Sequence, residues 1–201
     1  HLSLRRQRQM CIRDRQTPVG KSGRRANGSD VFGIDSVNEF DIFLDDIYDY
    51  CETLDIGVDT LVHESGPSQI EINLNHGDPL KLADQTFMFK RAVRQVALKH
   101  GIHATFMAKP HQGQPGSSMH IHQNLVSIKN NNNIFSDENG KESEKFYNYI
   151  GGLQTYLPDA MVFFAPYVNS YRRFVIDASA PINTHWGFEN RTVGLLSLIH
   201  I

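Results

Sequence analysis

The sequence predicts an α+β fold of helices and antiparallel strands, on the basis of three features. Residues 69–75 alternate strictly between polar and apolar side chains, with Ile70, Ile72 and Leu74 on one face, which is typical of a strand with one buried side. Residues 40–51 and 83–100 instead repeat apolar side chains with the period of a helix. Further short strands stand between the helices, and neighbouring strands can pair antiparallel, which suits an α+β domain.

In the first part of the chain, the sequence predicts a loop, a helix and a strand. Residues 17–27 are rich in glycine, proline and basic residues and form the loop. Ser36 and Glu39 match a capping box that starts a helix. The apolar stripe of this helix comprises Phe40, Phe43, Leu44, Ile47, Tyr48 and Cys51. Gly57 ends the helical pattern, and residues 58–62 form a strand that precedes strand 69–75.

The elements after residue 75 follow from the same signals. Residues 83–100 form a long helix that Gly101 ends. The apolar stripe of this helix comprises Phe87, Ala92, Val96 and Leu98. Two strands are predicted at 104–107 and 118–125, and two helices at 142–153 and 157–164. The run of asparagines at 130–133 predicts a hairpin tip or loop between them.

Composition and length place the chain among soluble globular proteins. It has 201 residues, of which 40% are hydrophobic and 21% charged. The longest purely apolar run, residues 160–165, is far too short to span a membrane, and no signal-peptide pattern is visible. The two cysteines, Cys11 and Cys51, suggest no disulfide framework. We therefore expect a cytoplasmic protein that has no membrane partner.

The two ends of the chain have the features of translated adapter DNA. "MCIRDR" (10–15) and "LSLIHI" (196–201) can be written in codons that are reverse complements of each other and resemble a transposase adapter. We therefore expect residues 1–15 and 196–201 to be non-native and exclude them from the fold prediction. The remaining chain holds 15 Lys and Arg against 21 Asp and Glu, a net charge of −6. This acidic balance argues against a nucleic-acid partner.

A candidate metal site is indicated by carboxylates and imidazoles on the predicted strands. His120 and His122, in "GSSMHIHQ", fall on one face of strand 118–125 because they are two residues apart. Glu64 follows strand 58–62, and Glu71 lies on the polar face of strand 69–75. Oxygen and nitrogen ligands of this kind suit Mg²⁺ or Mn²⁺ better than zinc. For each residue taken singly, a solvated strand face is the more frequent explanation.

Three arginines complete the candidate site. Arg172 and Arg173 lie in "NSYRRF", and Arg191 lies in "ENRTVGL". Guanidinium groups bind carboxylates and phosphates through two parallel hydrogen bonds. A surface arginine remains the alternative for any one of them.

Five motifs together resemble those of class I glutamine synthetases. "ATFMAKP", "GSSMHIHQ", "NSYRRF", "SAPIN" and "ENRTVGL" occur in the order and spacing of that family, over residues 17–195. The resemblance implies that residues 16–195 form a partial catalytic domain, an open curved antiparallel sheet backed by helices. It further implies ATP as co-substrate, two Mg²⁺ or Mn²⁺ ions per complete site, and a homo-oligomeric ring.

The resemblance also implies a role for each candidate residue. Glu64, Glu71 and His120 are implied to bind metal ions. His122 and Arg191 are implied to contact the nucleotide, and Gly116 and Arg173 to bind glutamate. Arg173 and Arg191 are also implied to be the catalytic residues. Such groups are needed because ATP must phosphorylate the γ-carboxylate of glutamate before an amine can displace it. Metal ions and arginines neutralise the charge that develops when the two anions meet.

Departures from the family pattern indicate the amine. Ammonia-using members carry a flap glutamate where this chain has Ser179, and an asparagine where it has Pro115. Loss of an anionic flap removes a cation site and suits a bulkier amine. "NEFDIFLDDIYDYCE", "INLNHGDPLKLADQTFMFKRAVR" and "NTHWGFENRTVGL" resemble the γ-glutamylputrescine synthetase branch of the family. This resemblance implies a ligase for a polyamine or other primary amine. The alternatives are an ammonia-using glutamine synthetase and a catalytically inactive relative with a structural role.

Parts of the family's active site are expected outside this chain. The first metal-binding glutamate pair should precede Thr17, and the last metal-binding glutamate should follow Leu195. Asn124 stands where many members have a serine that contacts the nucleotide. We therefore expect the small-molecule substrates (glutamate, an amine and ATP) to bind a complete enzyme, and this chain alone to be inactive.

Overall fold

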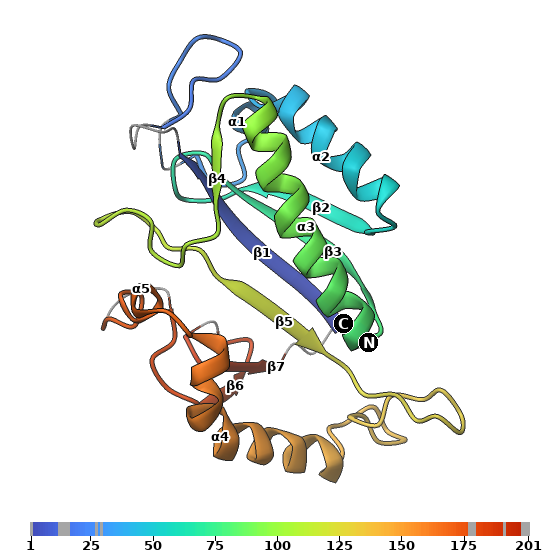
Figure 1. The fold of residues 1–201 in the computed structure, drawn as a ribbon. Helices are drawn as coiled ribbons and strands as arrows, with labels where there is room; N and C mark the ends of the chain where they lie inside the picture. Colours follow the sequence, from blue (N-terminus) through green and yellow to red (C-terminus); the bar gives the residue numbers. More distant parts are fainter. Residues whose placement is uncertain are drawn as a thin grey trace. The chain divides into compact units, whose positions relative to one another are not determined.

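The computed structural model describes residues 2–11, 17–26, 28, 30–176, 180–190 and 192–197, with the backbone alone for residues 2–11. The chain divides into two compact units, His1–Gln123 and Asn124–Ile201. The first unit contains a five-stranded sheet and three helices, and the second contains a long helix, a short one and a two-stranded sheet (Figure 1). Each unit is described by itself below.

The first unit is built on an antiparallel sheet. Its strands follow the order β2 (Val58–His63), β3 (Gln69–Gly77), β1 (Leu2–Cys11) and β4 (His103–Thr105). Strand β5 (Met119–Gln123) also pairs with β1, and all of these pairings are antiparallel. The predicted strands at 58–62, 69–75, 104–107 and 118–125 are therefore all present, within two residues at most ends.

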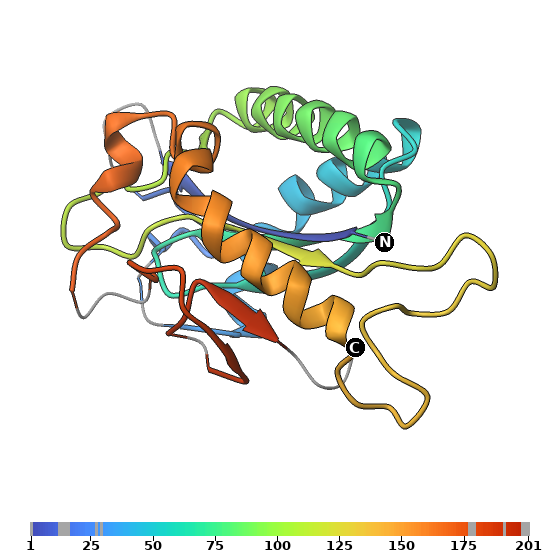
Figure 2. The same cartoon turned by 90° about the horizontal axis from the view of Figure 1, so that it is seen from below.

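Two long helices cover one face of this sheet. Helices α2 (Asp41–Thr53) and α3 (Pro79–Lys99) lie on the same side of the strands, whereas α1 (Ile34–Asn38) is short (Figures 1 and 2). Helix α3 begins at Pro79 because the carboxylate of Asp78 accepts the N–H groups of Leu80 and Lys81, both at 3.0 Å. The sequence predicts the start of this helix at residue 83, about one helical turn after the observed start. The difference arises because the Asp78 cap precedes the apolar residues on which that prediction rests.

The core lies between the helices and the sheet. It joins the buried faces of α2, β3 and α3, and its members from these elements are Phe43, Leu44, Ile47, Cys51, Ile70, Ile72, Leu74, Phe89, Val93, Val96 and Ala97. Burial of each large apolar side chain contributes about 1.5–3 kcal/mol. The predicted apolar faces of 40–51 and 69–75 are thus confirmed, apart from Tyr48, which is exposed.

The predicted capping box is wrong. Ser36 lies inside α1, and Gly33 and Phe40 are the N-caps of α1 and α2. The Ser36 hydroxyl is hydrogen-bonded to the Asp30 carboxylate, and Glu39 accepts the N–H of Ser22 at 3.0 Å. Both side chains are therefore engaged by the preceding loop and not by the start of a single helix.

Two predicted burial patterns also need correction. Phe87 and Leu98 of α3 are 69% and 63% exposed, because the side of α3 that packs on the sheet is the side that carries Phe89. In β3, the polar face is buried as well, and its residues Gln69, Glu71 and Asn73 are 1%, 6% and 6% exposed. Strand β3 is flanked by β2 on one edge and β1 on the other, so it is an interior strand.

Strand β1 lies within the segment that the sequence analysis excluded. It occupies the middle of the sheet, where its register sets Arg6 opposite Ile72 and Arg8 opposite Ile70. Opposite residues of an antiparallel pair share a face. Arginine at two positions that match the apolar face of β3 is unusual for an interior strand. The adapter origin of residues 1–15 and 196–201 stays a prediction.

The second unit contains α4 (Glu144–Phe164), α5 (Val168–Tyr171) and a parallel pair of β6 (Trp186–Phe188) with β7 (Leu195–Ser197). Helix α4 begins where the Ser143 hydroxyl accepts the N–H of Phe146 at 3.2 Å. The two helices predicted at 142–153 and 157–164 are one helix with Pro158 inside it. The predicted loop at 130–133 is confirmed, because Asn131 has a left-handed φ of 57°.

Candidate functional site

The sheet register places Glu71 and His120 on one face. Glu71 is opposite Gln7 of β1, and His120 is opposite Arg5 of the same strand. Gln7 and Arg5 are two residues apart, so their partners on either side share a face. This face is the one turned away from α2 and α3, since the alternate residues of β3, such as Ile72, pack in the core beneath the helices.

Glu64 and His122 belong to the same face. The N–H of Glu64 donates to the carbonyl of Gln69 at 2.7 Å, which extends the β2–β3 pairing beyond the last residue of β2. Glu64 is two residues after Val62, which is opposite Glu71 in the register. Glu64 therefore lies on the same face of the sheet as Glu71. His122 lies two residues beyond His120. The predicted convergence of these four residues on one face of one sheet agrees with the register.

This face does not form a closed metal-binding cluster. Among the residues that the structure describes, no three His, Cys, Asp or Glu side chains are grouped closely enough to hold a metal ion. Strand β1 separates β3 from β5, and the β1 partners of Glu71 and His120 are two residues apart, so the two residues lie roughly 11–12 Å apart in the sheet. That separation suits their prediction as ligands of two different ions better than of one.

Gly116 is tied to the start of β3. Its carbonyl accepts a hydrogen bond from the side-chain Nε2 of Gln69 at 2.9 Å. The N–H of the next residue, Ser117, donates to the carbonyl of Ala108 at 2.8 Å. Gln69 was not singled out by the sequence analysis. The alternation of polar and apolar residues already placed Gln69 on the polar face of Glu71, two residues before it, and this could have indicated its role.

The predicted arginines lie in the second unit. Arg173 follows α5 and is half-buried, whereas its neighbour Arg172 is exposed. Burial lowers the pKa of the Arg173 guanidinium from its ordinary value. A partly desolvated guanidinium gains more from pairing with an anion than a hydrated one does. Arg191 and Ser179 lie outside the described residues.

The comparisons with known proteins agree with this geometry. A family model described as "Glutamine synthetase, catalytic domain" matches residues 3–197. The chain belongs to the glutamine synthetase family. The resemblance drawn from the five motifs is thereby confirmed.

Relatives of glutamine synthetase type differ in the amine that they are named for. The chain is 41% identical over 85% of its length to the γ-glutamylputrescine synthetase PuuA of Escherichia coli, and 34% identical over 88% to a glutamate–isopropylamine ligase of a Pseudomonas species. It is 40% identical over 73% to a glutamine synthetase of Pyrococcus horikoshii. These alignments cover 36%, 37% and 32% of the relatives, so the chain spans about a third of their length.

Solved structures of the glutamine synthetase fold match nearly the whole chain. A structure titled "Apo GmaS without ligand" superposes with a TM-score of 0.82 at 26% identity, over 98% of this chain and 46% of that one. The glutamine synthetase of Plasmodium falciparum matches with a TM-score of 0.81 at 22% identity, over 99% and 44%. The predicted fold class, a partial glutamine synthetase catalytic domain, is confirmed.

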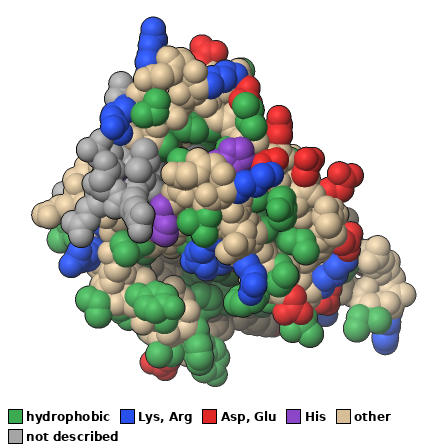
Figure 3. All heavy atoms as spheres, turned by 45° about the horizontal axis from the view of Figure 1, so that its top comes forward, with side chains coloured by type: hydrophobic (Ala, Val, Ile, Leu, Met, Phe, Trp, Pro, Cys, Tyr) green, Lys and Arg blue, Asp and Glu red, His purple; other side chains and the backbone are tan. Residues whose placement is uncertain are grey.

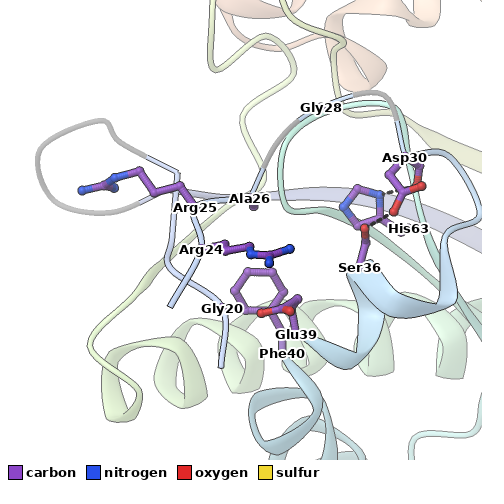
Figure 4. Close-up of a pocket in the computed structure, with 10 residues that line it drawn as sticks. All are labelled: Gly20, Arg24, Arg25, Ala26, Gly28, Asp30, Ser36, Glu39, Phe40 and His63. Atoms are coloured by element: carbon purple, nitrogen blue, oxygen red, sulfur yellow. Dashed lines mark hydrogen bonds between the residues drawn. The ribbon is translucent and has the colours of Figure 1, made fainter. Parts of the chain in front are cut away.

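One cavity of this glutamine synthetase domain lies away from the predicted site. It has a volume of about 230 Å³ and is lined by residues of the 20–30 loop, α1 and β2 (Figure 4). Buried His63 donates through Nδ1 to the Asp30 carbonyl at 3.0 Å, while Arg24 and Glu39 lie across the cavity. His63 is opposite Ile70 in the register, so it belongs to the helix-covered face and not to the face of Glu71.

The outer surface of the first unit is acidic over α2. Acidic side chains gather on one side of the face shown in Figure 3, and α2 contributes the exposed Asp45, Asp49 and Glu52. Such a surface repels the phosphates of a nucleic acid.

Within the described residues, no helix combines the length and the hydrophobicity needed to cross a membrane.

Proposed function

We propose that the complete protein is an ATP-dependent ligase that joins the γ-carboxylate of glutamate to a primary amine. The observation that carries the proposal is the similarity, over more than four-fifths of this chain, to two relatives named for amine ligation. The shared sheet face of Glu64, Glu71 and His120 supports it, because the chemistry needs cation ligands beside the reacting phosphoryl group.

The reaction follows from the charges that must meet. A γ-carboxylate oxygen of glutamate attacks the γ-phosphorus of ATP, the bond to the bridging oxygen breaks, and ADP leaves. The amine then attacks the γ-carbonyl carbon, loses a proton and expels phosphate. The products are a γ-glutamyl amide, ADP and phosphate. Because the first step joins two anions, positive charge near both is the main requirement of the site.

The residues of this chain fit that requirement. Glu64 and Glu71 offer oxygen donors and His120 offers a nitrogen donor, a set suited to two Mg²⁺ or Mn²⁺ ions. Bound there, the ions would neutralise the phosphoryl oxygens and align them. Arg173, whose guanidinium is partly desolvated, would hold a carboxylate of the substrate, and His122 and Arg191 would lie near the nucleotide.

Ammonia is the second candidate amine. The 40% identity to a glutamine synthetase of Pyrococcus horikoshii favours it. Ser179 argues for a larger amine, since a hydroxyl cannot provide the negative charge that binds ammonium. We further propose that the complete enzyme is cytoplasmic and forms a homo-oligomeric ring. Sedimentation of the full-length protein would test the ring.

The amine is tested with the purified full-length enzyme. Glutamate, ATP and Mg²⁺ are incubated with ammonium, putrescine or isopropylamine, and both phosphate release and product mass are measured. We expect a γ-glutamyl amide of a primary amine, with kcat/KM at least tenfold above that for ammonium. Highest efficiency with ammonium would show a glutamine synthetase instead. Absence of phosphate release with every amine would contradict the ligase function.

A further inference from the structure

We propose that Gln69 is a positioning residue that fixes the glutamate-binding loop at Gly116 against the metal-binding strand of Glu71. The proposal rests on the proposed function for the roles of Gly116 and Glu71. It adds a residue to which the family resemblance assigned no role, and it is carried by two hydrogen bonds of one buried side chain.

Both ends of the Gln69 amide are engaged. Its Oε1 accepts the N–H of Gly66 at 2.8 Å, and its Nε2 donates to the carbonyl of Gly116 at 2.9 Å. Gln69 is 1% exposed. A backbone N–H can only donate and a carbonyl can only accept, so the two partners fix which end of the amide is oxygen. The side chain thus has one orientation.

The first hydrogen bond closes the turn that carries Glu64. The N–H of Gln69 donates to the Gly66 carbonyl at 3.0 Å, and the carbonyl of Gln69 accepts from Glu64 at 2.7 Å. A Cβ at position 66 would stand 2.7 Å from Oε1 of Gln69, so a larger residue there would displace this amide oxygen. Gln69 therefore binds both ends of the turn between β2 and β3.

The second hydrogen bond joins segments that are 47 residues apart in the sequence. Gln69 is the first residue of β3 and stands two residues before Glu71, on the same face. Hence one side chain connects the turn of Glu64, the strand of Glu71 and the loop of Gly116. The first unit is proposed to hold a metal ion or the substrate glutamate at these three places and at His120.

Such a connection matters because phosphoryl transfer depends on position. The γ-carboxylate must lie in line with the γ-phosphate, and a misplacement of about 1 Å can cost about 10²-fold in rate. Without the Nε2 hydrogen bond, the Gly116 carbonyl loses its link to β3, and the glutamate site is free to shift. Because His122 and Arg191, the residues assigned to the nucleotide, take no part in these two hydrogen bonds, we expect the KM for ATP to be unaffected.

The test compares three variants of the full-length enzyme. Gln69→Met fills the same space without hydrogen bonds, and Gln69→Asn keeps the amide but is too short to reach both partners. Asn73→Met is the matched control, since Asn73 is a buried amide on the same face of β3 that donates to Thr60 Oγ1 at 2.5 Å. Asn73→Met should lower the thermal midpoint and leave both KM values within twofold.

We expect both Gln69 variants to raise the KM for glutamate at least tenfold and to leave the KM for ATP within twofold. An unchanged KM for glutamate in both variants would overturn the proposal. So would an equal rise of both KM values in Gln69→Met and Asn73→Met, because that pattern indicates general loosening of the strand.

A second measurement separates this proposal from the proposed function. Amide hydrogen exchange of Gly66 is followed in the wild type and in Gln69→Met, in the absence of substrates. We expect faster exchange at Gly66 in the variant, since the acceptor of its N–H is lost. An unchanged rate there would overturn the positioning role of Gln69. If the exchange rises as expected but the wild type makes no γ-glutamyl product, the proposed function fails and the positioning role of Gln69 does not.

Discussion

At the scale of single residues, the proposed metal binding rests on Glu71 and His120. They come from strands that are not neighbours in the sheet, yet the register through β1 gives them the same face. Glu71 is 6% exposed on an interior strand. Under the proposed function, a bound cation would stabilise its carboxylate.

The metal role predicts the effect of removing each ligand. In the full-length enzyme, Glu71→Ala and His120→Ala should each reduce kcat at least tenfold and shift the Mg²⁺ titration to higher concentration, because each removes a ligand near the reacting phosphate. His103→Ala, an exposed histidine on another strand of the sheet, is the control and should retain its Mg²⁺ dependence. Unchanged Mg²⁺ titrations in both ligand variants would exclude the assignment.

Ser179 carries the prediction about amine size. Ser179→Glu in the full-length enzyme should lower kcat/KM for putrescine and raise relative use of ammonium, because it adds an anionic group at the flap position. Competition between the two amines, followed by product mass, measures the ratio. A wild-type enzyme that already prefers ammonium would show that the serine does not set the preference.

At the scale of elements, α3 shows how a helix face is chosen by its neighbours. Phe89 is fully buried, whereas Phe87, two residues before it, is 69% exposed. Phe89→Ala should lower the free energy of unfolding by about 3–5 kcal/mol, whereas Phe87→Ala should change it by at most about 0.5 kcal/mol. Urea unfolding of both variants measures this. Similar losses in the two would mean that α3 is rotated about its axis.

The contact between α2 and α3 predicts a pH dependence. Hydrogen bonds from Lys99 and then His100 to the Asp46 carboxylate, at 2.9 and 2.7 Å, hold the pKa of Asp46 below its ordinary value. A folded-state pKa below the unfolded one adds stability above the unfolded pKa, and this is lost as the pH falls through the folded pKa. Asp46→Asn should therefore lower the thermal midpoint at pH 7 but not near pH 2.

The control for this helix contact is Asp45→Asn. Asp45 is exposed on the same helix. Its variant should keep the midpoint of the wild type at pH 7. A difference between wild type and Asp46→Asn that persists unchanged from about pH 5 to about pH 2 would contradict the ion-pair explanation.

At the scale of the whole molecule, β1 decides whether the sheet of the first unit is continuous. It is the strand that pairs with β3, β4 and β5, so without it these strands would have no common partner in the described sheet. Its register sets Arg6 and Arg8 opposite Ile72 and Ile70. Two charged residues of β1 therefore stand at positions that match the apolar face of β3.

This register predicts a stabilising double substitution. Arg6→Val with Arg8→Val in the 201-residue chain should raise the urea midpoint, because apolar residues replace charges at positions that match the apolar face of β3. Arg5→Val with Gln7→Val, at the alternate positions, should not raise it. A higher midpoint in the second pair alone would indicate a register shifted by one residue.

The sequence by itself determined the family, the α+β class and most of the elements, because periodicity and motif order are local properties of the chain. Strand 69–75, the stripe of 40–51 and the pair His120–His122 needed no knowledge of neighbours. The family resemblance further implied seven site residues, of which Arg191 lies outside the described residues.

Only the tertiary structure decided what depends on which segments meet. It buried Phe89 in place of Phe87, turned Ser36 and Glu39 towards the preceding loop, and made β3 an interior strand. It also gave Gln69 its link to Gly116, 47 residues away. The physical reason is common to all four cases. A polar group or an apolar side chain takes the partner that the fold brings within reach, and sequence spacing alone does not specify that partner.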